Sequence, residues 1–479
     1  MDMLIDGIWT GASDGATDPV LNPATNAEIG SVPRATAADV ERAIDAAQRG
    51  AKAMAAMPAW RRYEILEVVA RRIEENQTRL GELLCLENGK RIGETTSEVG
   101  VAARIFRGYA EEAKRIFGKA VPLHAIPGRE KSLAITTRYP LGVIAAIVPF
   151  NYPVELWSHK VAGGLAAGNA VITKTPEDCP LAILEVARFI EEAGLPTGAH
   201  QVLTGGRDVG EALVRSPGVQ MIAMTGSTAA GKRILEVAAQ TLKKVHLELG
   251  GNDATIVCDD ADIDATADAL IAGRFTSGNG QICCAVKRVL VNRSVYDRLL
   301  AAVTDRTRRL RVGDPMDPAT NVGPLINRRG AERVEAQVAQ AVADGATVVT
   351  GGKRRDNFYE PTILTGVTPG TPAFAEETFG PVLPLIPYDD FEAALALAND
   401  SPFGLQAAIF THDIRRVMRA YELLDVGTVV VNHTTAVRVE TLPFGGNKGS
   451  GNGREGIHDT LHEMSKEKTL LLHEIFGGL

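Results

Sequence analysis

Short apolar runs alternate with segments of helical periodicity between residues 143 and 248. The apolar runs have the length of single strands and lie at 143–148, 170–173, 201–203, 220–224 and 244–247. Strands that alternate with helices along a chain form a parallel sheet with helices on both faces. A second α/β pattern runs from Ala254 to about Val431. The sequence therefore predicts an α/β fold with two such regions.

The segments outside these regions are mostly short strands and long helices. Thr36-Ala37-Ala38-Asp39 matches a capping box, which predicts that an Ala-rich helix begins there. Longer helical patterns follow at 61–86 and 98–117, and residues 132–139 resemble a strand. The apolar run 469–473 also resembles a strand but has no obvious partner of its own.

The length and composition of the chain restrict its class. With 479 residues the chain is too long for one small core, so two or three domains are expected. A net charge of -8 and the lack of a lysine and arginine cluster argue against a nucleic-acid partner. Five cysteines, an odd number, do not form a disulfide framework and suggest a reducing compartment. The N-terminus lacks signal-peptide features, and the longest apolar stretches, such as 141–150, are shorter than the roughly 20 residues that span a bilayer. We therefore expect a cytoplasmic protein without a membrane partner.

Cys283 is the first candidate for chemistry. It ends the run Gly280-Gln281-Ile282-Cys283, which belongs to a flexible polar loop before a strand-like run. A thiol in such a loop can act as a nucleophile, although most cysteines of this kind are buried structural residues. Cys284 is a rival, because two neighbouring side chains of one short segment cannot both face one substrate. The cysteines that we interpret as structural are Cys85, Cys179 and Cys258.

Glu248 and Asn151 offer the two other groups that acyl chemistry on sulfur requires. Glu248 ends a strand-like run, at the sheet edge where α/β proteins place their sites, and can activate a water there. Its alternative is an ordinary exposed carboxylate. Asn151 lies in a Pro-flanked turn after a strand, and its side-chain N–H can stabilise an oxyanion. Its alternative is a turn residue that bonds only locally.

Two strand ends carry residues that suit a dinucleotide. Gly226 and Ser227 follow a strand and open a helix, whose N-terminus can hold a pyrophosphate, although Ser227 also suits a simple N-cap. Lys174 and Glu177 follow another strand, and a carboxylate there can accept from ribose hydroxyls and repel a 2′-phosphate. The nine histidines are scattered and no Cys-x-x-Cys occurs, so we expect no metal site.

With these residues assembled, the chain resembles the aldehyde dehydrogenase superfamily nearly from end to end. The matching motifs occur in family order at 22–25, 149–153, 168–169, 174–177, 194–196, 225–227, 248–251, 280–283, 376–381 and 443–446. The resemblance implies that Cys283 is the nucleophile, Glu248 the base and Asn151 the oxyanion donor. It also implies NAD as the cofactor, with NADP as the alternative. The implied cofactor contacts are Phe150, Lys174, Glu177, Gly226, Ser227, Glu377 and Phe379.

The resemblance further implies the division of the chain. It implies a Rossmann-like NAD-binding domain over 1–120 and 141–250 and an α/β catalytic domain over 251–450. Residues 121–140 and 451–479 would form a small β oligomerisation flap, which gives the unpaired C-terminal strand a partner. A homodimer or homotetramer is therefore expected.

The expected substrate is a short polar or anionic aldehyde that resembles lactaldehyde, phosphonoacetaldehyde or a semialdehyde. His159, eight residues after Asn151, matches the position where the family lines its substrate tunnel. Arg107 and Arg438 are further candidates for binding an anion, with a solvated surface charge as the alternative for each. An aromatic or general aldehyde remains open as the substrate. A CoA-acylating dehydrogenase is a closer rival but does not need a base such as Glu248, and a Cys-Glu-Lys amidase would have no use for a dinucleotide site.

Overall fold

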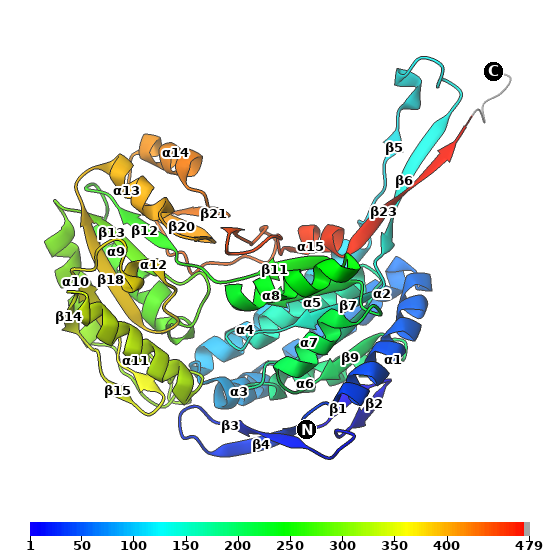
Figure 1. Ribbon diagram of the computed structural model, residues 1–479, viewed down its shortest axis with the longest axis horizontal. Coiled ribbons are helices and arrows are strands. Elements are labelled where there is room, and N and C mark those ends of the chain that lie inside the picture. Colours follow the sequence, from blue (N-terminus) through cyan, green and yellow to red (C-terminus); the bar gives the residue numbers. More distant parts are fainter. Residues whose placement is uncertain (474–479) are drawn as a thin grey trace.

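Two seven-stranded sheets form the two halves of the molecule, and a long β arm extends from one of them (Figure 1). The structure is a computed structural model that describes residues 1–473. The first sheet has five parallel strands, followed by two strands that run antiparallel to their neighbours. Its order is β11 (Lys244–Glu248), β10 (Met221–Thr225), β7 (Val143–Ile147), β8 (Ala170–Lys174), β9 (His200–Leu203), β1 (Met3–Ile5) and β2 (Ile8–Thr10). It contains every strand that was predicted between residues 143 and 248.

Successive residues of β7 belong to two different hydrophobic cores. Ile144 and Ala146 pack in the first core, and Val143 and Ala145 pack in the second. The helices of the first core are α2 (Ala59–Glu75), α3 (Gln77–Asn88), α4 (Ile92–Ala113), α5 (Pro153–Ala166) and α6 (Leu181–Glu192). Those of the second are α1 (Ala37–Ala56), α7 (Arg207–Arg215) and α8 (Thr228–Ala238). A strand covered on both faces needs apolar side chains at every position, which explains the uninterrupted apolar runs of the sequence.

The helix ends show where local sequence decides the structure. The predicted capping box is confirmed: the Thr36 hydroxyl accepts from the Asp39 N–H at 3.2 Å, and the Asp39 carboxylate accepts from the Thr36 N–H at 2.9 Å. The single helix predicted over 61–86 is wrong, because α2 and α3 are separated at Asn76. Asn76 has the non-helical angles φ −109° and ψ 11°, and its side-chain amide bonds back to the Arg72 carbonyl. This local bond competes with helix continuation.

The second sheet forms the other half of the molecule. Its order is β14 (Thr347–Thr350), β17 (Thr362–Thr365), β18 (Val382–Tyr388), β13 (Arg288–Asn292), β12 (Ala254–Val257), β20 (Gln406–Phe410) and β21 (Thr428–Val431), and only β14 is antiparallel to its neighbour. One face packs on α11 (Arg328–Ala343), α12 (Pro372–Ala375), α13 (Phe391–Asn399) and α14 (Ile414–Leu423). The other packs on α9 (Ile263–Ile271) and α10 (Tyr296–Arg308). The second α/β region of the sequence is thus a sheet of its own.

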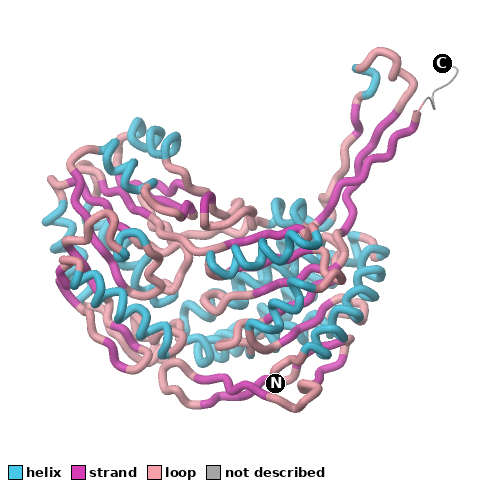
Figure 2. The backbone as a smooth tube through the Cα atoms, viewed as in Figure 1, coloured by secondary structure: helices cyan, strands magenta, loops and turns pink. Residues whose placement is uncertain are grey.

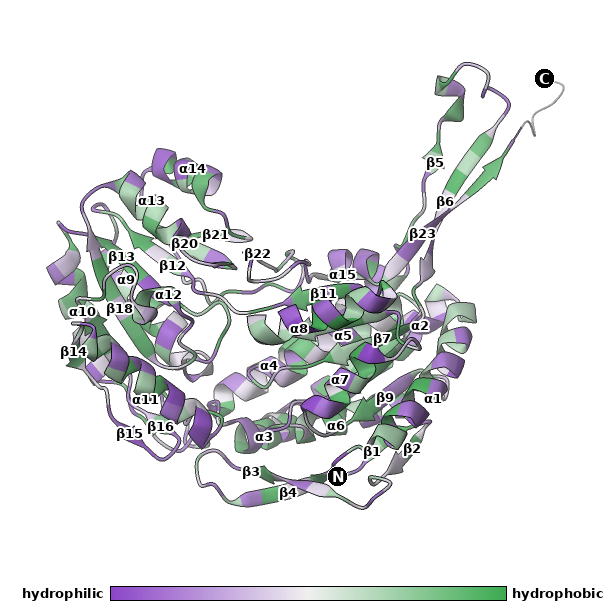
Figure 3. Cartoon of the chain, viewed as in Figure 1, coloured by the Kyte–Doolittle hydropathy of each residue, from purple (hydrophilic) through white to green (hydrophobic). Residues whose placement is uncertain are grey.

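The β arm joins distant parts of the chain (Figures 1 and 2). Strand β23 (Ser465–Leu472) pairs antiparallel along its whole length with β6 (Leu133–Pro140), and β5 (Ala120–Val121) adds a third strand. The C-terminal strand therefore has the partner segment that the resemblance implied. Leu470 and Leu471 are 51% and 57% exposed, and hydrophobic residues appear along the arm in Figure 3. The last part of the expected flap, 474–479, lies outside the described residues.

Several short elements complete the fold. They are β3 (Thr17–Leu21) with β4 (Glu28–Pro33), β15 (Arg354–Arg355) with β16 (Phe358–Tyr359), β19 (Phe403–Gly404) with β22 (Asn447–Lys448), α15 (Ile457–Glu463), 3-10 turns at Leu123–Ala125, Ala239–Thr241 and Gly278–Gly280, and a π turn at Ala272–Thr276. Within residues 1–473, no helix has both the length and the apolar composition needed to cross a membrane.

Candidate active site

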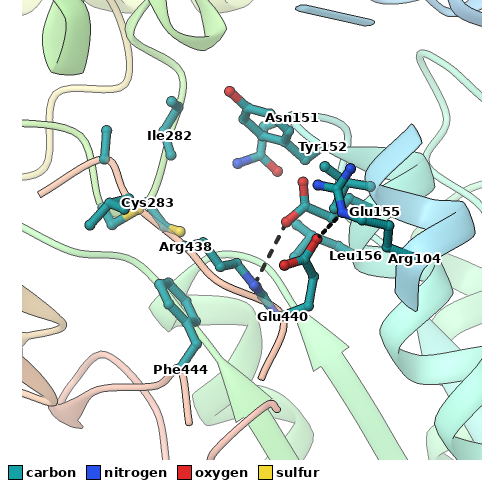
Figure 4. A pocket seen from close by; sticks show the side chains of 14 residues that line it. Arg104, Asn151, Tyr152, Glu155, Leu156, Ile282, Cys283, Arg438, Glu440 and Phe444 are labelled. Carbon is teal, nitrogen blue, oxygen red and sulfur yellow. Dashed lines mark hydrogen bonds and ion pairs between the residues drawn. The ribbon is translucent and has the colours of Figure 1, made fainter. Parts of the chain in front are cut away.

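A cavity of about 200 Å³ lies where the two halves meet. Its lining comes from α4, from the turn that opens α5, from the segment that contains Cys283, and from residues 436–444. Figure 4 shows Asn151 and Cys283 on this cavity, together with Arg438 and two carboxylates, Glu155 and Glu440. The structure therefore brings the candidate nucleophile and the candidate oxyanion donor, more than one hundred residues apart in sequence, to one site.

The loop before Cys283 has an unusual backbone that fixes the position of the thiol. Gly278, Asn279 and Gly280 have φ angles of +54°, +53° and +77°, in the left-handed region that glycine and asparagine tolerate. The Asn279 side chain donates to the Gly89 and Pro324 carbonyls, both at 3.0 Å. A Cβ atom on Gly280 would lie 2.5 Å from the Gly380 carbonyl carbon, so no larger residue fits there. The expected flexible loop is thus tied to both halves of the molecule.

The thiols of The interaction with the Cys284 thiol, together with burial, raises the pKa of Cys283 well above its ordinary value, and the Lys287 ammonium opposes this rise. Cys283 is therefore a protonated thiol in this arrangement. It needs a proton acceptor, or a further positive charge nearby, to become a nucleophile.

Asn151 is held by its backbone and leaves its side chain available. Its carbonyl accepts from Lys90 Nζ at 2.6 Å, and the preceding Phe150 carbonyl accepts from Asn88 Nδ2 at 2.6 Å. The Oδ1 atom of Asn151 is buried and has no hydrogen-bond partner among the described residues. Lys90 in turn forms a buried ion pair with Glu98, whose other oxygen accepts from backbone N–H groups at the start of α5. These bonds fix the turn that presents the Asn151 amide to the cavity.

Glu248 lies at the end of β11, behind the cavity rather than on its lining. Its side chain is almost fully buried, and neither carboxylate oxygen has a hydrogen-bond partner in the part of the chain that the structure describes. The nearest titratable group is His246, whose Nε2 atom lies 3.6 Å from Oε1. Burial raises the pKa of Glu248. An unpartnered carboxyl that gains its proton easily suits a group that exchanges protons with water.

Arg438 lies at the centre of a charge network on one wall of the cavity. Its Nη2 atom donates to Glu455 Oε1 at 2.7 Å, and Glu455 Oε2 accepts from the buried Lys160 at 2.8 Å. Although burial opposes the effect, Lys160 and Arg438 hold the pKa of Glu455 well below its usual range. The Nε atom of Arg438 lies 3.7 Å from Glu155 and forms no hydrogen bond. Arg438 thus presents a free donor at the predicted anion contact.

The sequence analysis missed the carboxylates and cations that surround Arg438. Glu155 lines the cavity, and burial, opposed by Arg438, raises its pKa to about 7. Arg104 donates to Glu440 at 2.8 Å on the same lining (Figure 4). Arg104 lies on the helical pattern predicted at 98–117, and only its spacing from the neighbouring cavity residue Val101 could have suggested it.

The structure does not bring His159 or Arg107 to the cavity lining. His159 is fully buried in α5, where its Nδ1 atom lies 3.2 Å from the Tyr109 hydroxyl, and burial holds its pKa well below the ordinary value. Arg107 pairs on the outside of the helices with Glu74, at 2.6 and 2.9 Å, and with Glu67 at 3.3 Å. The expected substrate contacts are thus a neutral core histidine and a surface ion pair.

A second cavity, of about 470 Å³, lies between α7 and α8 at the ends of β7, β8 and β10. Lys174 and Ser227 line it, and Lys174 Nζ lies 3.7 Å from Glu177. Ser227 caps α8 by accepting from the Ala230 N–H at 3.3 Å. A Cβ atom on Gly226 would lie 2.3 Å from the Met224 side chain, so this turn requires glycine or a shift of Met224. A helix N-terminus, an ammonium and a carboxylate beside one cavity fit the diphosphate and ribose of a dinucleotide.

The remaining predicted cofactor contacts lie together near the thiol. The rings of Phe150 and Phe379 meet edge to face, with centroids 5.8 Å apart. Glu377 Oε1 accepts from the Gly251 N–H at 3.2 Å and from Lys287 Nζ at 3.0 Å. Sequence reasoning did not identify Lys287, which links this carboxylate to the cysteine segment.

The described residues hold no group of three or more histidine, cysteine or carboxylate side chains placed to bind a metal ion. Two histidines do share a His-x-x-x-His spacing, which the sequence analysis did not single out. His458 and His462 lie on α15 with ring centroids 4.6 Å apart, and His458 bonds Glu112 at 2.7 Å. This pair is a surface contact between α15 and α4.

Comparisons with known proteins agree with this geometry. The chain matches the model of the aldehyde dehydrogenase family over residues 9–470. It is 40% identical over 472 residues to the 3-sulfolactaldehyde dehydrogenase of Priestia aryabhattai, covering 98% of each chain. It is 39% identical over 457 residues to the NADP(+) succinate-semialdehyde dehydrogenase of Escherichia coli, covering 95% of this chain and 94% of that one. Aldehyde dehydrogenase 21 of Physcomitrella patens, solved with the reaction product succinate, superposes with a TM-score of 0.96 at 34% identity, covering 100% of this chain and 99% of that one.

The chain therefore belongs to the aldehyde dehydrogenase family, and it is an oxidoreductase that acts on aldehydes. The fold of two α/β halves, with a Rossmann-like sheet in the first, is the fold of this family.

Proposed function

We propose that the protein oxidises a short polar or acid-bearing aldehyde to the carboxylic acid, with NAD as the electron acceptor. One observation carries the substrate class: Arg438 presents an unpartnered buried donor to the same cavity as Cys283 and Asn151. The relatives named for sulfolactaldehyde and succinate semialdehyde, both of which carry an acid group, support it.

The side chains of the cavity have the roles that this reaction needs. The Cys283 thiolate attacks the aldehyde carbon, and the oxyanion that forms accepts hydrogen bonds from the Asn151 side-chain amide and the Cys283 backbone N–H. A bound nicotinamide would accept the hydride that leaves this carbon, and the carbon then becomes a thioester. Glu248 removes a proton from water, which attacks the thioester and releases the acid and the thiol.

The size and charge of the cavity favour a short substrate. About 200 Å³ holds a few heavy atoms beyond the aldehyde group. Arg438 would bond the acid group, and Glu155, with a pKa near 7, can donate or accept beside it. A long alkyl or aromatic aldehyde would place apolar surface against these buried charges, which is unfavourable.

Two residues of the second cavity favour NAD over NADP. Glu177 lies at the end of the segment that follows β8, beside Lys174, where a ribose would bind. A carboxylate there accepts from ribose hydroxyls and repels a 2′-phosphate. Arg207 and Arg233 also line this cavity and offer the opposite charge, so NADP is the alternative cofactor.

A screen of NADH formation tests the proposal. Aldehydes of equal chain length that end in a carboxylate, sulfonate, phosphonate, hydroxyl or methyl group are compared by kcat/KM. The acid-bearing compounds are expected to exceed the methyl compound by at least about tenfold, since a charged hydrogen bond contributes roughly 1.5–3 kcal/mol. A best rate with hexanal or benzaldehyde would contradict the substrate class and favour a general or aromatic aldehyde dehydrogenase.

A further inference from the structure

Lys287 joins three segments that are far apart in the sequence. Its Nζ atom donates to the Gly251 carbonyl at 2.8 Å, to the Cys283 carbonyl at 2.8 Å and to Glu377 Oε1 at 3.0 Å. Its side chain is 1% exposed. Gly251 follows the candidate base, Cys283 is the candidate nucleophile, and Glu377 is a candidate cofactor contact. One ammonium therefore touches the backbone or side chain of each of these motifs.

The geometry around this ammonium is fully specified. A lysine has three N–H donors and each of them has an acceptor here, so no water is needed to complete the shell. Glu377 Oε1 also accepts from the Gly251 N–H at 3.2 Å, which closes a ring of bonds between two of the segments. Burying an ammonium is costly unless it is paired and hydrogen-bonded. A buried lysine at this position thus requires all three partners to stay in place.

The bond to the Cys283 carbonyl acts on the nucleophile itself. That carbonyl belongs to the peptide that joins Cys283 to Cys284, so the bond sets the plane of the peptide from which both thiols project. The ammonium charge also lowers the pKa of both thiols, against the effect of Glu377. The titratable groups that face the thiols and the ammonium are Cys283, Cys284, Glu377, Arg438 and Asp253. Burial raises the pKa of Asp253, so it adds no negative charge beside the ammonium.

We propose that Lys287 is a positioning residue for the aldehyde oxidation, which holds the Cys283 peptide and the Glu377 carboxylate in one fixed relation and places a positive charge beside the nucleophile. The inference rests on the proposed function, because it takes Cys283 as the nucleophile. Lys287 does not touch the substrate; it acts through Cys283 and Glu377.

Alkylation of Cys283 tests this without cofactor or aldehyde. The rate of modification by iodoacetamide is measured against pH in a Cys284→Ala background, with mass spectrometry to confirm the site. Lys287→Met removes the charge and the three donors at similar length, and it is expected to move the midpoint of the profile upward by about one pH unit or more. Lys287→Arg keeps the charge and is expected to restore most of the shift. Lys243→Met is the matched control, since Lys243 also donates to two backbone carbonyls, those of Ser216 and Val219, far from the cavity.

A second variant keeps the inference testable if Lys287→Met does not fold. Glu377→Gln keeps an acceptor for Lys287 and removes the opposing negative charge, so the midpoint for Cys283 is expected to fall. An unchanged midpoint in a folded Lys287→Met protein, or in Glu377→Gln, would overturn the role of Lys287. Because alkylation does not depend on turnover, such a result is separate from a failure to oxidise aldehydes.

Discussion

Arg438 and Glu455 form a buried ion pair, with Nη2 and Oε1 2.7 Å apart, that leaves the Nε atom of the same guanidinium without a hydrogen bond. Lys160 holds the other oxygen of Glu455 at 2.8 Å, so the carboxylate is fully engaged. The arginine is therefore fixed in place by one edge and open toward the cavity by the other. This arrangement makes the substrate class testable at a single side chain.

Arg438→Met is expected to lower kcat/KM for an acid-bearing aldehyde by roughly 10- to 100-fold, because a charged hydrogen bond of about 1.5–3 kcal/mol is lost. The rate with an alkyl aldehyde should change much less. Steady-state kinetics with both substrates measures the difference. Arg107→Met is the matched control, since Arg107 also pairs with two glutamates but does not line the cavity. His159→Leu should likewise leave the preference between the two substrates unchanged, and an equal loss on both substrates in Arg438→Met would count against anion binding.

Cys283→Ala is expected to abolish NADH formation while NAD still binds, because no covalent intermediate can form. Cys284→Ala should keep substantial turnover. Its thiol, unlike that of Cys283, is almost fully buried in a small apolar cluster with Ile282 and Phe444. Activity assays and a titration of cofactor binding by fluorescence measure the two effects. If Cys284→Ala were the inactive variant, the nucleophile would be the neighbouring residue.

Glu248→Gln is expected to slow the hydrolysis of the thioester more than its formation, since only hydrolysis needs the base. A rapid burst of NADH followed by a slow steady state should appear, with the acyl-enzyme visible by mass spectrometry. In the wild-type protein the ionised base is present only above its pKa, and burial raises that pKa. The steady-state rate should therefore rise with pH through a value above that of an ordinary glutamate, and Glu248→Gln should remove this limb. A steady-state rate equal to that of the wild type would exclude Glu248 as the base.

The preference of the enzyme for NAD should depend on Glu177. The ratio of kcat/KM for NAD to that for NADP is expected to fall by about tenfold or more in Glu177→Gln, because the repulsion of a 2′-phosphate is removed. Lys174, Arg207 and Arg233 remain to bind the phosphate in this variant. Kinetics with both cofactors decides the point. A clear preference for NADP in the wild-type protein would contradict the assignment of Glu177.

The β arm is expected to form a contact between subunits, in a homodimer or homotetramer. Leu470 and Leu471 are more than half exposed on β23, and leucines in adjacent positions of an edge strand are costly in water. Leu470→Asp and Leu471→Asp together should lower the oligomeric state in light scattering coupled to size-exclusion chromatography. Ile414→Asp, an equally exposed position on α14, is the control. A wild-type monomer would contradict the expectation directly.

The sequence predicted the parts of this fold that depend on neighbouring residues. The buried strands of the first sheet are continuous apolar runs because both faces are covered, and the capping box at Thr36 needs only four residues. Cys283 and Asn151 could be placed at one site because each follows glycine- or proline-rich turns at strand ends. The meeting of these two residues in one cavity agrees with that interpretation.

The charged wall of the cavity could not be predicted in the same way. Lys160 and Glu455 are 295 positions apart, so no local pattern connects them. His159 follows the cavity residue Glu155 by four positions, which keeps it on the same side of α5 but places it about 6 Å deeper along the helix axis. Nearly every residue of α5 is buried, so the sequence contains no polar face that would show which side chains meet the cavity.

The alternation of β7 between two cores also limits how this protein can change during evolution. Ile144 and Ala146 belong to one core and Val143 and Ala145 to the other, so inserting a single residue in the strand would exchange the two sets. The same insertion would move Asn151, which follows the strand by only four positions, relative to Cys283. Insertions and deletions should therefore accumulate in surface hairpins such as β3–β4, while the spacing from Val143 to Asn151 stays constant in any lineage that keeps the activity.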